Sequence, residues 1–346
     1  MVPDGGAGSE RGRRGRGEPL TERAGSGHVE ASELAFAYRV CEAEVLAHYE
    51  NFTVASRLLP QSLRPHLAAI YAYCRTVDDL GDEFAGDRMK ALDAVESVIR
   101  SLYGEGPGPR GDTAGLRPEI VRALGDTIAA LDLPAEPFLR LIEANRMDQE
   151  RSRFQTFEEL RAYTRLSAEP VGHLVLLVFG YRDEWRMRLS DETCTALQLA
   201  NFWQDVGPDL RRGRLYIPLE DLDRYDLAPE ALGSPGDPRV SRLMAMEVAR
   251  ARAGFALGAP LEETVPLRLR LQLRLYRLGG EAILAALERQ GLDPFVGRPH
   301  LGPWAKFVVS LRALGGPWGS AKAPRAGAPD VSDWVPTVRP RGTGGR

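Results

Sequence analysis

Apolar residues recur at intervals of three and four positions through most of the chain. This spacing gathers apolar side chains on one face of an α-helix, whereas the alternating pattern of β-strands is scarce. The segments predicted to be helical are 32–50, 60–100, 117–131, 136–149, 156–179, 187–210, 239–258, 267–290 and 302–314. We therefore expect an all-α fold of roughly eight to ten helices.

The helical pattern runs without a change of composition that would separate two domains. Gly and Pro cluster at "YGEGPGPRGD", "RRGRLYIP" and "LGSPGDPR", where the pattern breaks. Both ends of the chain are aperiodic and rich in Gly and charged or Pro residues, which predicts disordered tails over 1–29 and 315–346. One folded domain over 30–314 is expected.

Composition removes several classes of function. The 45 basic and 48 acidic residues give a net charge of −3, which offers no bulk attraction to nucleic acid or to an anionic membrane. The three cysteines, Cys41, Cys74 and Cys194, have neither the number nor the spacing of a disulfide framework or a zinc site. No apolar stretch reaches the roughly 18 residues of a membrane span, and the N-terminus lacks the apolar core of a secretory signal. These features predict a cytoplasmic protein.

The stretch "YAYCRTVDDLGDE" carries a polar stripe on an otherwise apolar helix. Its members are spaced four, three and four positions apart, namely Tyr71, Arg75, Asp78 and Asp82. At about 100° per residue they fall within roughly 60° of arc. Since the other faces of this helix are apolar, we expect the stripe to face a cavity.

A second stretch, "TALQLANFWQDVGPDLRRGRLYIP", repeats the arrangement. Its stripe has spacings of three, four and four, at Gln198, Asn201, Asp205 and Asp209. Both stretches therefore contain a D-x-x-x-D pair, with the two carboxylates on the same face of a mostly apolar helix.

Paired carboxylates in an apolar setting require a cation. Acids four positions apart repel each other, and burying each charge costs several kcal/mol. Oxygen ligands select hard divalent ions, and Mg²⁺ binds through one or two carboxylates together with phosphate oxygens. Arg75 and the basic run Arg211, Arg212 and Arg214 would contact the same phosphates. The pattern indicates a site for a diphosphate.

Such a clamp facing an apolar cavity suits the ionisation of an isoprenoid diphosphate. The metal makes diphosphate a good leaving group, and apolar walls tolerate a carbocation while excluding water. Tyr71, Tyr73, Phe202 and Trp203 could stabilise positive charge, although aromatic residues at helical spacing also serve as plain core. A different class remains open: a non-catalytic helical scaffold whose acidic stripes are solvated faces.

These stretches resemble the two Asp-rich signatures of the squalene/phytoene synthase family, all-α enzymes that join isoprenyl diphosphates head to head. The segments "ENFTVASRLLP", "YTRLSAEPVGHLVL" and "RLYRLGGEAILAALERQGLD" are also similar to family segments. The resemblance covers most of 35–314. It implies a single-domain isoprenoid synthase fold, a helical bundle around a central cavity.

The family resemblance implies roles for individual residues. Two or three Mg²⁺ ions would be held by Asp78, Asp82, Asp205 and Asp209. Diphosphate contacts are implied at Arg75, Arg298 and Lys306, with solvated surface as the alternative for the last two. The substrate pocket is implied at Asn51, Tyr71, Gln198, Asn201 and Gln204.

The second signature indicates a branch of the family. Phytoene and presqualene diphosphate synthases usually read like "NILRDV", whereas this chain reads "NFWQDV", with Gln204 in place of an arginine. This is similar to the hydroxysqualene synthase branch of bacterial hopanoid pathways, in which presqualene diphosphate loses diphosphate and water captures the cation. The alternative is a presqualene diphosphate, squalene or phytoene synthase. A chain-elongating prenyltransferase or terpene cyclase fits the second signature less well.

Two further features stay open on sequence alone. Glu169 stands where the branch commonly has an amide, and its carboxylate could alter water placement or face solvent. The stretch "LRLRLQLRLYRL" from Leu267 could contact a membrane surface, or could be a core-facing helix with arginines on its solvent side. The expected partners are an isoprenoid diphosphate and, through the pathway, upstream and downstream hopanoid enzymes, with no nucleic acid.

Overall fold

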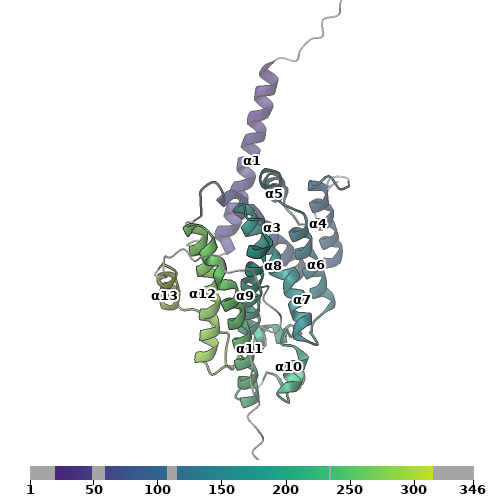
Figure 1. Cartoon of the computed structure of the whole chain (residues 1–346). Coiled ribbons are helices and arrows are strands. Elements are labelled where there is room, and N and C mark those ends of the chain that lie inside the picture. Colours follow the sequence, from purple (N-terminus) through teal and green to yellow (C-terminus); the bar gives the residue numbers. More distant parts are fainter. Residues whose placement is uncertain (1–19, 49–58, 107–114, 234, 315–346) are drawn as a thin grey trace, which may run out of the picture.

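The computed structural model describes residues 20–48, 59–106, 115–233 and 235–314, which form helices joined by turns and loops (Figure 1). Within these ranges the β-structure is limited to one isolated bridge between Arg153 and Leu215. The prediction of an all-α fold is confirmed.

The helices follow the predicted segments, with two of the segments divided. The α-helices are α1 (Leu20–His48), α3 (Arg64–Asp82), α4 (Arg88–Leu102), α5 (Pro118–Leu131), α6 (Glu136–Glu150), α7 (Phe157–Ser167), α8 (Glu169–Val178), α9 (Glu184–Arg211), α10 (Leu219–Arg224), α11 (Pro238–Gly258), α12 (Leu267–Arg289) and α13 (Pro303–Leu314). The short 3₁₀-helices are η1 (Pro229–Ala231) and η2 (Ala259–Thr264).

Capping and proline explain both divisions. The predicted segment 60–100 becomes α3 and α4 because the Asp87 side chain accepts a hydrogen bond from the Lys90 backbone N–H, which starts a new helix. The segment 156–179 becomes α7 and α8 at Ala168. Pro170 follows there, and a proline cannot supply the N–H that would continue the helix.

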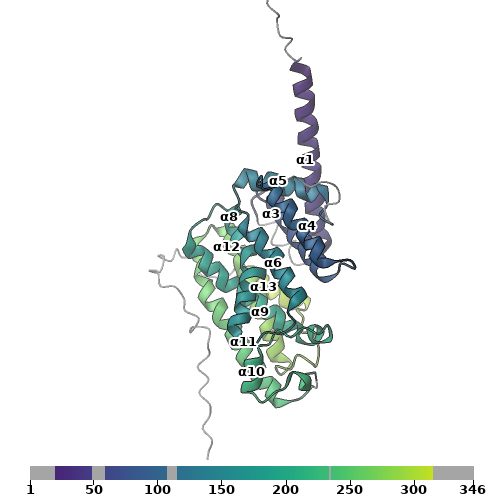
Figure 2. The same cartoon turned by 90° about the vertical axis from the view of Figure 1, so that its right-hand side faces the viewer.

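Helix α1 begins at Leu20 and so includes residues 20–29, which the sequence pattern assigned to the N-terminal tail. A helix that is already nucleated gains one hydrogen bond for each residue added, which favours this extension. The C-terminal part of α1 packs on α3 and α5 through the buried Ala37, Cys41 and Val45, while its N-terminal part projects from the bundle (Figures 1 and 2). Residues 1–19 and 315–346 lie outside the described ranges.

The buried apolar residues form two large clusters, and the two predicted motifs belong to different ones. The first cluster joins α1, α3, α4 and α5, with contributions from α6 and α8. The second joins α7, α9, α10, α11 and α12, with Ala144 of α6. Figure 2 shows the α1, α3, α4 and α5 group above the group of α9 and α11. Helix α9 is central, in contact with α7, α8, α11 and α12.

Two arginines of the basic stretch in α12 form ion pairs within the chain. Arg274 Nε donates to Glu262 Oε2 over 3.1 Å, and Arg277 Nε donates to Glu262 Oε1 over 2.6 Å. Leu269 and Leu271 are buried. These two arginines therefore pair with η2 instead of standing on a solvent side, and membrane contact stays a prediction. Among the described helices, none combines the length and apolar character that crossing a bilayer requires.

Candidate active site

The two D-x-x-x-D motifs meet through Arg214. Arg214 Nη1 donates to Asp82 Oδ1 over 2.8 Å, which ties the end of α3 to the segment that follows α9. The charges of Arg214 and Asp82 also act on the carboxyl of Asp209. Two stretches more than a hundred positions apart in sequence therefore share one electrostatic site.

Asp78 and Asp209 have carboxyl groups of raised pKa. The pKa of Asp78 is raised to about 6, first because surrounding protein excludes water from the carboxyl and then because Asp82 adds like charge. The pKa of Asp209 is also raised to about 6, by desolvation and then by the charge of Asp205. Asp78 nevertheless retains solvent-accessible surface. A bound cation would relieve the repulsion between such carboxyl groups and favour their ionised form.

Helix α6 approaches α3 closely beside Asp78. A Cβ atom on Gly81 would lie 2.0 Å from Oδ1 of Asn145, a distance that only glycine permits. The approach brings Asn145 Nδ2 to 3.4 Å from Asp78 Oδ1, and Gln149 Nε2 donates to the Gly81 carbonyl over 3.0 Å. The position of Asp78 is thus set by α6 as well as by its own helix.

Asp148 is an acid of the site that the sequence analysis did not identify. Its Oδ2 accepts from the Tyr163 hydroxyl over 2.6 Å and its Oδ1 from the Tyr216 hydroxyl over 3.4 Å. Burial raises the pKa of Asp148 to about 6, with a smaller contribution from the charge of Asp82. The Tyr216 ring stacks on Phe202 with centroids 4.0 Å apart, so an aromatic cluster adjoins this acid. In sequence Asp148 is one of four acids in an amphipathic helix and has no acid four positions before or after it, a pattern that is also typical of solvated surface.

Asp205 is held by an arginine from the other end of the chain. Arg298 Nε and Nη2 donate to its two carboxylate oxygens over 2.5 and 2.9 Å, a bidentate pair. Next to Asp205, the Gln204 side chain donates from Nε2 to the Pro299 carbonyl over 2.6 Å. The structure therefore brings Arg298 to the site, and Gln204 contacts the loop that carries it.

Arg75 is turned away from the acids with which it was grouped. Its Nη2 lies 2.5 Å from Asp79 Oδ1 and 3.9 Å from Glu83 Oε1. It lines a hollow of about 350 Å³ between α3 and the Glu44 and Arg117 side chains. The predicted diphosphate contact would need another side-chain conformation, because the i, i+4 pair with Asp79 is the closer attraction.

The other predicted residues are distributed as follows. Asn201 is exposed and Gln198 and Tyr71 are half-buried, although α9 and α3 are otherwise largely buried. Asn51 lies outside the described residues, as does the side chain of Lys306 in α13. Phe202 and Trp203 are both buried, and Trp203 Nε1 donates to the Glu247 carbonyl over 3.2 Å, so Trp203 is a core residue.

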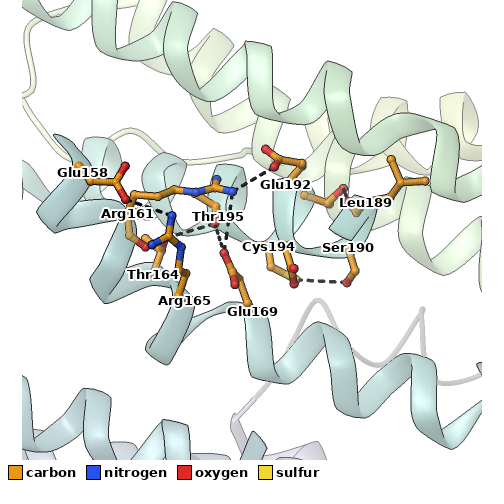
Figure 3. A network of polar contacts seen from close by, with 12 residues as sticks. Glu158, Arg161, Thr164, Arg165, Glu169, Leu189, Ser190, Glu192, Cys194 and Thr195 are labelled. Carbon is orange, nitrogen blue, oxygen red and sulfur yellow. Dashed lines mark hydrogen bonds and ion pairs between the residues drawn. The ribbon is translucent and has the colours of Figure 1, made fainter. Parts of the chain in front are cut away.

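Glu169 belongs to a buried polar network that joins α7, α8 and α9 (Figure 3). Its Oε1 accepts from the Thr195 hydroxyl over 3.3 Å, and its Oε2 lies 3.4 Å from Arg140 Nη2. Arg161 Nη2 lies 3.9 Å from Glu169 and donates to Glu192 over 3.0 Å. Burial raises the pKa of Glu169, and the arginines partly offset this. The alternative of a solvent-facing Glu169 is therefore wrong.

Each of the two pairs of motif carboxylates has the oxygen atoms to serve as ligands of a divalent cation. Within the described ranges no cluster of three or more His, Cys, Asp or Glu residues could hold a metal by itself. Mg²⁺, however, needs only one or two carboxylates when phosphate and water complete its shell. Asp82 and Asp205 already attract arginines, while Asp78 and Asp209 carry raised pKa values. The donor chemistry is that of hard cations.

Comparison with known proteins places the fold and the motifs in one family. Residues 45–305 match the family model described as squalene/phytoene synthase. The phytoene synthase of Arthrospira platensis is 31% identical over 292 residues, which is 79% of this chain and 90% of that one. The hydroxysqualene synthase of Rhodopseudomonas palustris is 31% identical over 268 residues, 77% of this chain and 88% of that one.

Solved structures agree with this assignment. The squalene synthase HpnC from Alicyclobacillus acidocaldarius is 52% identical, with a TM-score of 0.70, and covers 76% of this chain and 97% of its own. A dehydrosqualene synthase in complex with ligand is 20% identical with a TM-score of 0.73, over 82% of this chain and 98% of its own, which shows the common fold. With the match extending from α1 to α13, the chain belongs to the squalene/phytoene synthase family.

Proposed function

We propose that the protein is a hydroxysqualene synthase, which converts presqualene diphosphate and water into hydroxysqualene and diphosphate. The observation that carries the proposal is the 52% identity to the squalene synthase HpnC, compared with 31% to the phytoene synthase of Arthrospira platensis. The similarity to a hydroxysqualene synthase supports the same reaction. The enzyme would then be a carbon–oxygen lyase, whereas a phytoene synthase is a prenyltransferase.

The residues around Asp205 support a site for one diphosphate. A head-to-head condensation must hold two diphosphates, and relatives of that type usually carry an arginine directly before this acid. Here that position is Gln204, which is neutral and hydrogen-bonded to the Pro299 carbonyl. One cation fewer next to the acids suits a substrate with a single diphosphate.

Mg²⁺ fits the site as the metal of this reaction. Asp78 and Asp82 on α3 and Asp205 and Asp209 on α9 would hold it, together with the substrate oxygens. When bound, the metal supplies charge neutralisation that makes diphosphate a good leaving group. The number of ions, predicted as two or three, stays a prediction.

The chain itself would bind the diphosphate, orient it and control access of water. Arg214 and Arg298 present cationic nitrogen atoms beside the motif acids, where they attract phosphate oxygens. The carbon–oxygen bond to diphosphate breaks with its electron pair on the leaving group. After rearrangement the cation bonds to a water oxygen, which loses a proton. The buried Phe202 and the stacked Tyr216 supply an apolar, aromatic wall that limits water near the acids.

Product identification by mass spectrometry tests the proposal. Purified protein with Mg²⁺ should convert presqualene diphosphate into hydroxysqualene and should leave farnesyl diphosphate and geranylgeranyl diphosphate unreacted. Asp205→Asn serves as the inactive control. Condensation of either prenyl diphosphate, with presqualene diphosphate left untouched, would favour the prenyltransferase alternative instead.

A substitution at position 204 tests the subclass separately. Gln204→Arg restores the arginine that condensing relatives usually carry, so we expect a lower rate with presqualene diphosphate or a changed product ratio. Unchanged turnover and products would show that residue 204 does not determine the reaction. The proposal that rests on overall identity would still stand.

A further inference from the structure

Arg298 lies in a segment that two glutamine side chains hold from both sides. We call residues 290–302, between α12 and α13, the Arg298 loop. Gln290 Nε2 donates to the Gly297 carbonyl over 2.8 Å, and Gln204 Nε2 donates to the Pro299 carbonyl over 2.6 Å. Gly297 and Pro299 are the two neighbours of Arg298 in sequence. The backbone carbonyl of each residue that flanks Arg298 is therefore held by a neutral amide.

The loop has a further anchor at Asp293. This buried carboxylate accepts from the Gly236 backbone N–H over 2.7 Å and from the Phe295 backbone N–H over 2.9 Å. The loop is thus fixed at its start, at Gly297 and at Pro299, although it contains no helical hydrogen-bond ladder between Gly291 and Gly302. Anchors of this kind reduce the number of conformations that the free chain segment samples.

The anchors matter because the Arg298 side chain is otherwise poorly restrained. It is 61% exposed, while the Asp205 side chain that it contacts is 26% exposed. Exposed ion pairs contribute little by themselves, since holding a long side chain in one geometry loses conformational entropy. A backbone fixed in advance lowers that loss, and the bidentate geometry on Asp205 can then persist.

We propose that Gln204, supported by Gln290, is a positioning residue that holds the backbone of Arg298 so that its guanidinium stays at Asp205, ready to bind diphosphate. The proposal rests on the diphosphate chemistry of the proposed function. Gln204 then has a role although it is not an arginine. Its amide holds the loop from which the Arg298 guanidinium reaches Asp205. The alternative is a purely structural role, in which Gln204 only donates a hydrogen bond to the carbonyl of the buried Pro299.

Binding of inorganic pyrophosphate in the presence of Mg²⁺, measured by calorimetry, separates the two readings. Gln204→Met keeps side-chain length and lacks the donor, so we expect binding to weaken roughly 5-fold, as for one lost hydrogen bond. Gln290→Met should weaken binding in the same direction from the other side of the loop. Arg298→Gln should weaken it by roughly 10-fold or more. Gln272→Met is the matched control, because this buried glutamine donates to Tyr276 in α12, away from the loop.

The decisive comparison is the double variant. If Gln204 acts through Arg298, Gln204→Met should have little further effect on pyrophosphate affinity in the Arg298→Gln background. Hydrogen exchange of the free proteins should be faster at residues 296–300 in Gln204→Met than in the wild type. Faster exchange with unchanged affinity, or equal losses in both backgrounds, would overturn the positioning role.

The same experiment distinguishes this inference from the proposed function. If wild-type protein binds no pyrophosphate with Mg²⁺, the diphosphate chemistry itself fails. If the wild type binds and Arg298→Gln binds weakly, while Gln204→Met binds normally, only the positioning role fails. Gln290→Met, which acts from the exposed side of the loop, keeps the test available if Gln204→Met does not fold.

Discussion

Asp78 combines accessible surface with a pKa raised to about 6 by desolvation and by the like charge of Asp82, a combination that is common at functional sites. If Asp78 holds the metal as proposed, Asp78→Asn should lower turnover by about 100-fold or more, since a metal-binding oxygen contributes several kcal/mol to stabilising the leaving group. Steady-state kinetics with presqualene diphosphate and Mg²⁺ provides the measurement.

The neighbouring Asp79 is a matched control on the same helix. Its Oδ1 pairs with Arg75 Nη2 over 2.5 Å on the side of the hollow lined by Glu44 and Arg117. We expect Asp79→Asn to change turnover by less than about 5-fold, as for a half-exposed ion pair. Equal losses in the two variants would contradict the division of this helix into a site face and a structural face.

A second residue-scale prediction concerns Glu247, which is fully buried beside Arg250 and Asp221. Burial raises the pKa of Glu247 to about 8 from its usual 4.5, an effect that Arg250 partly offsets. Because the folded protein holds this proton more tightly than the unfolded chain, the stabilising contribution is complete below pH 4.5 and is lost as the pH rises through 8.

Glu247→Gln should therefore flatten the loss of stability between about pH 5 and about pH 8. The difference in unfolding free energy should reach a few kcal/mol at most, in favour of the variant at the higher pH. Denaturant unfolding at several pH values measures it. Glu288→Gln, which changes a surface acid paired with Arg252, is the control and should leave the wild-type pH dependence in place.

At the scale of residues, the sequence predicted those site residues that belong to a repeated motif. Four acids in two matching i, i+4 pairs stood out on apolar helices, and the structure links Asp82 to the neighbourhood of Asp209 through Arg214. Asp148 had no such repeat, and only tertiary contact with Tyr163 and Tyr216 makes it part of the site. Arg75 pairs with Asp79 and not with the adjacent Asp78. The sequence did not predict this choice, because it depends on which of the two carboxylates lies closer in the folded protein.

At the scale of elements, the close approach of α3 and α6 is the most testable contact. Gly81→Ala would place a Cβ atom 2.0 Å from Asn145 Oδ1, so we expect a loss of about 1–3 kcal/mol in unfolding free energy and a lower turnover. Thermal unfolding and kinetics measure the two effects. Asn145→Ala in the same chain should recover most of the stability.

Gly125→Ala in α5 is the matched control for this substitution. Its added Cβ would meet only the end of the flexible Leu102 side chain at 3.2 Å. We expect a small gain or no change in stability, because alanine has the higher helix propensity. A similar loss in both variants would show that the contact with Asn145 is not the cause.

Helix periodicity was enough to predict the long elements and not the short ones. The segments 117–131 and 136–149 correspond closely to α5 and α6, whose apolar faces repeat over several turns. The six-residue α10 is too short to show a period, and its register depends on Leu219 N–H donating to the Phe154 carbonyl over 3.0 Å. The Arg298 loop was equally hidden, since two of its anchors are contacts with residues distant in sequence, Gln204 and Gly236.

For the whole molecule, the two hydrophobic clusters predict how ligand affects stability. Helix α3 is built into one cluster and α9 into the other, and the motif acids lie on these two helices. Mg²⁺ with inorganic pyrophosphate at about 100 times its Kd should stabilise the fold by about 2.7 kcal/mol and raise the unfolding midpoint by several degrees. Differential scanning fluorimetry measures this shift.

The controls for this experiment separate metal from anion. Mg²⁺ alone should shift the midpoint less, because each carboxylate pair leaves most of the metal shell to water and phosphate. Pyrophosphate with a chelator should also shift it less, since the acids then repel the anion. An equal shift with and without the chelator would indicate an anion site independent of the motif acids.

The placement of α3 and α9 in separate cores has a consequence for reading genetic variation in this chain. A substitution that changes side-chain volume deep in either core displaces one acid pair relative to the other without altering any residue that touches substrate. In a survey of variants, such changes would register as catalytic defects in well-folded protein. Interior positions such as Leu92 or Leu243 should therefore be scored for activity and abundance separately.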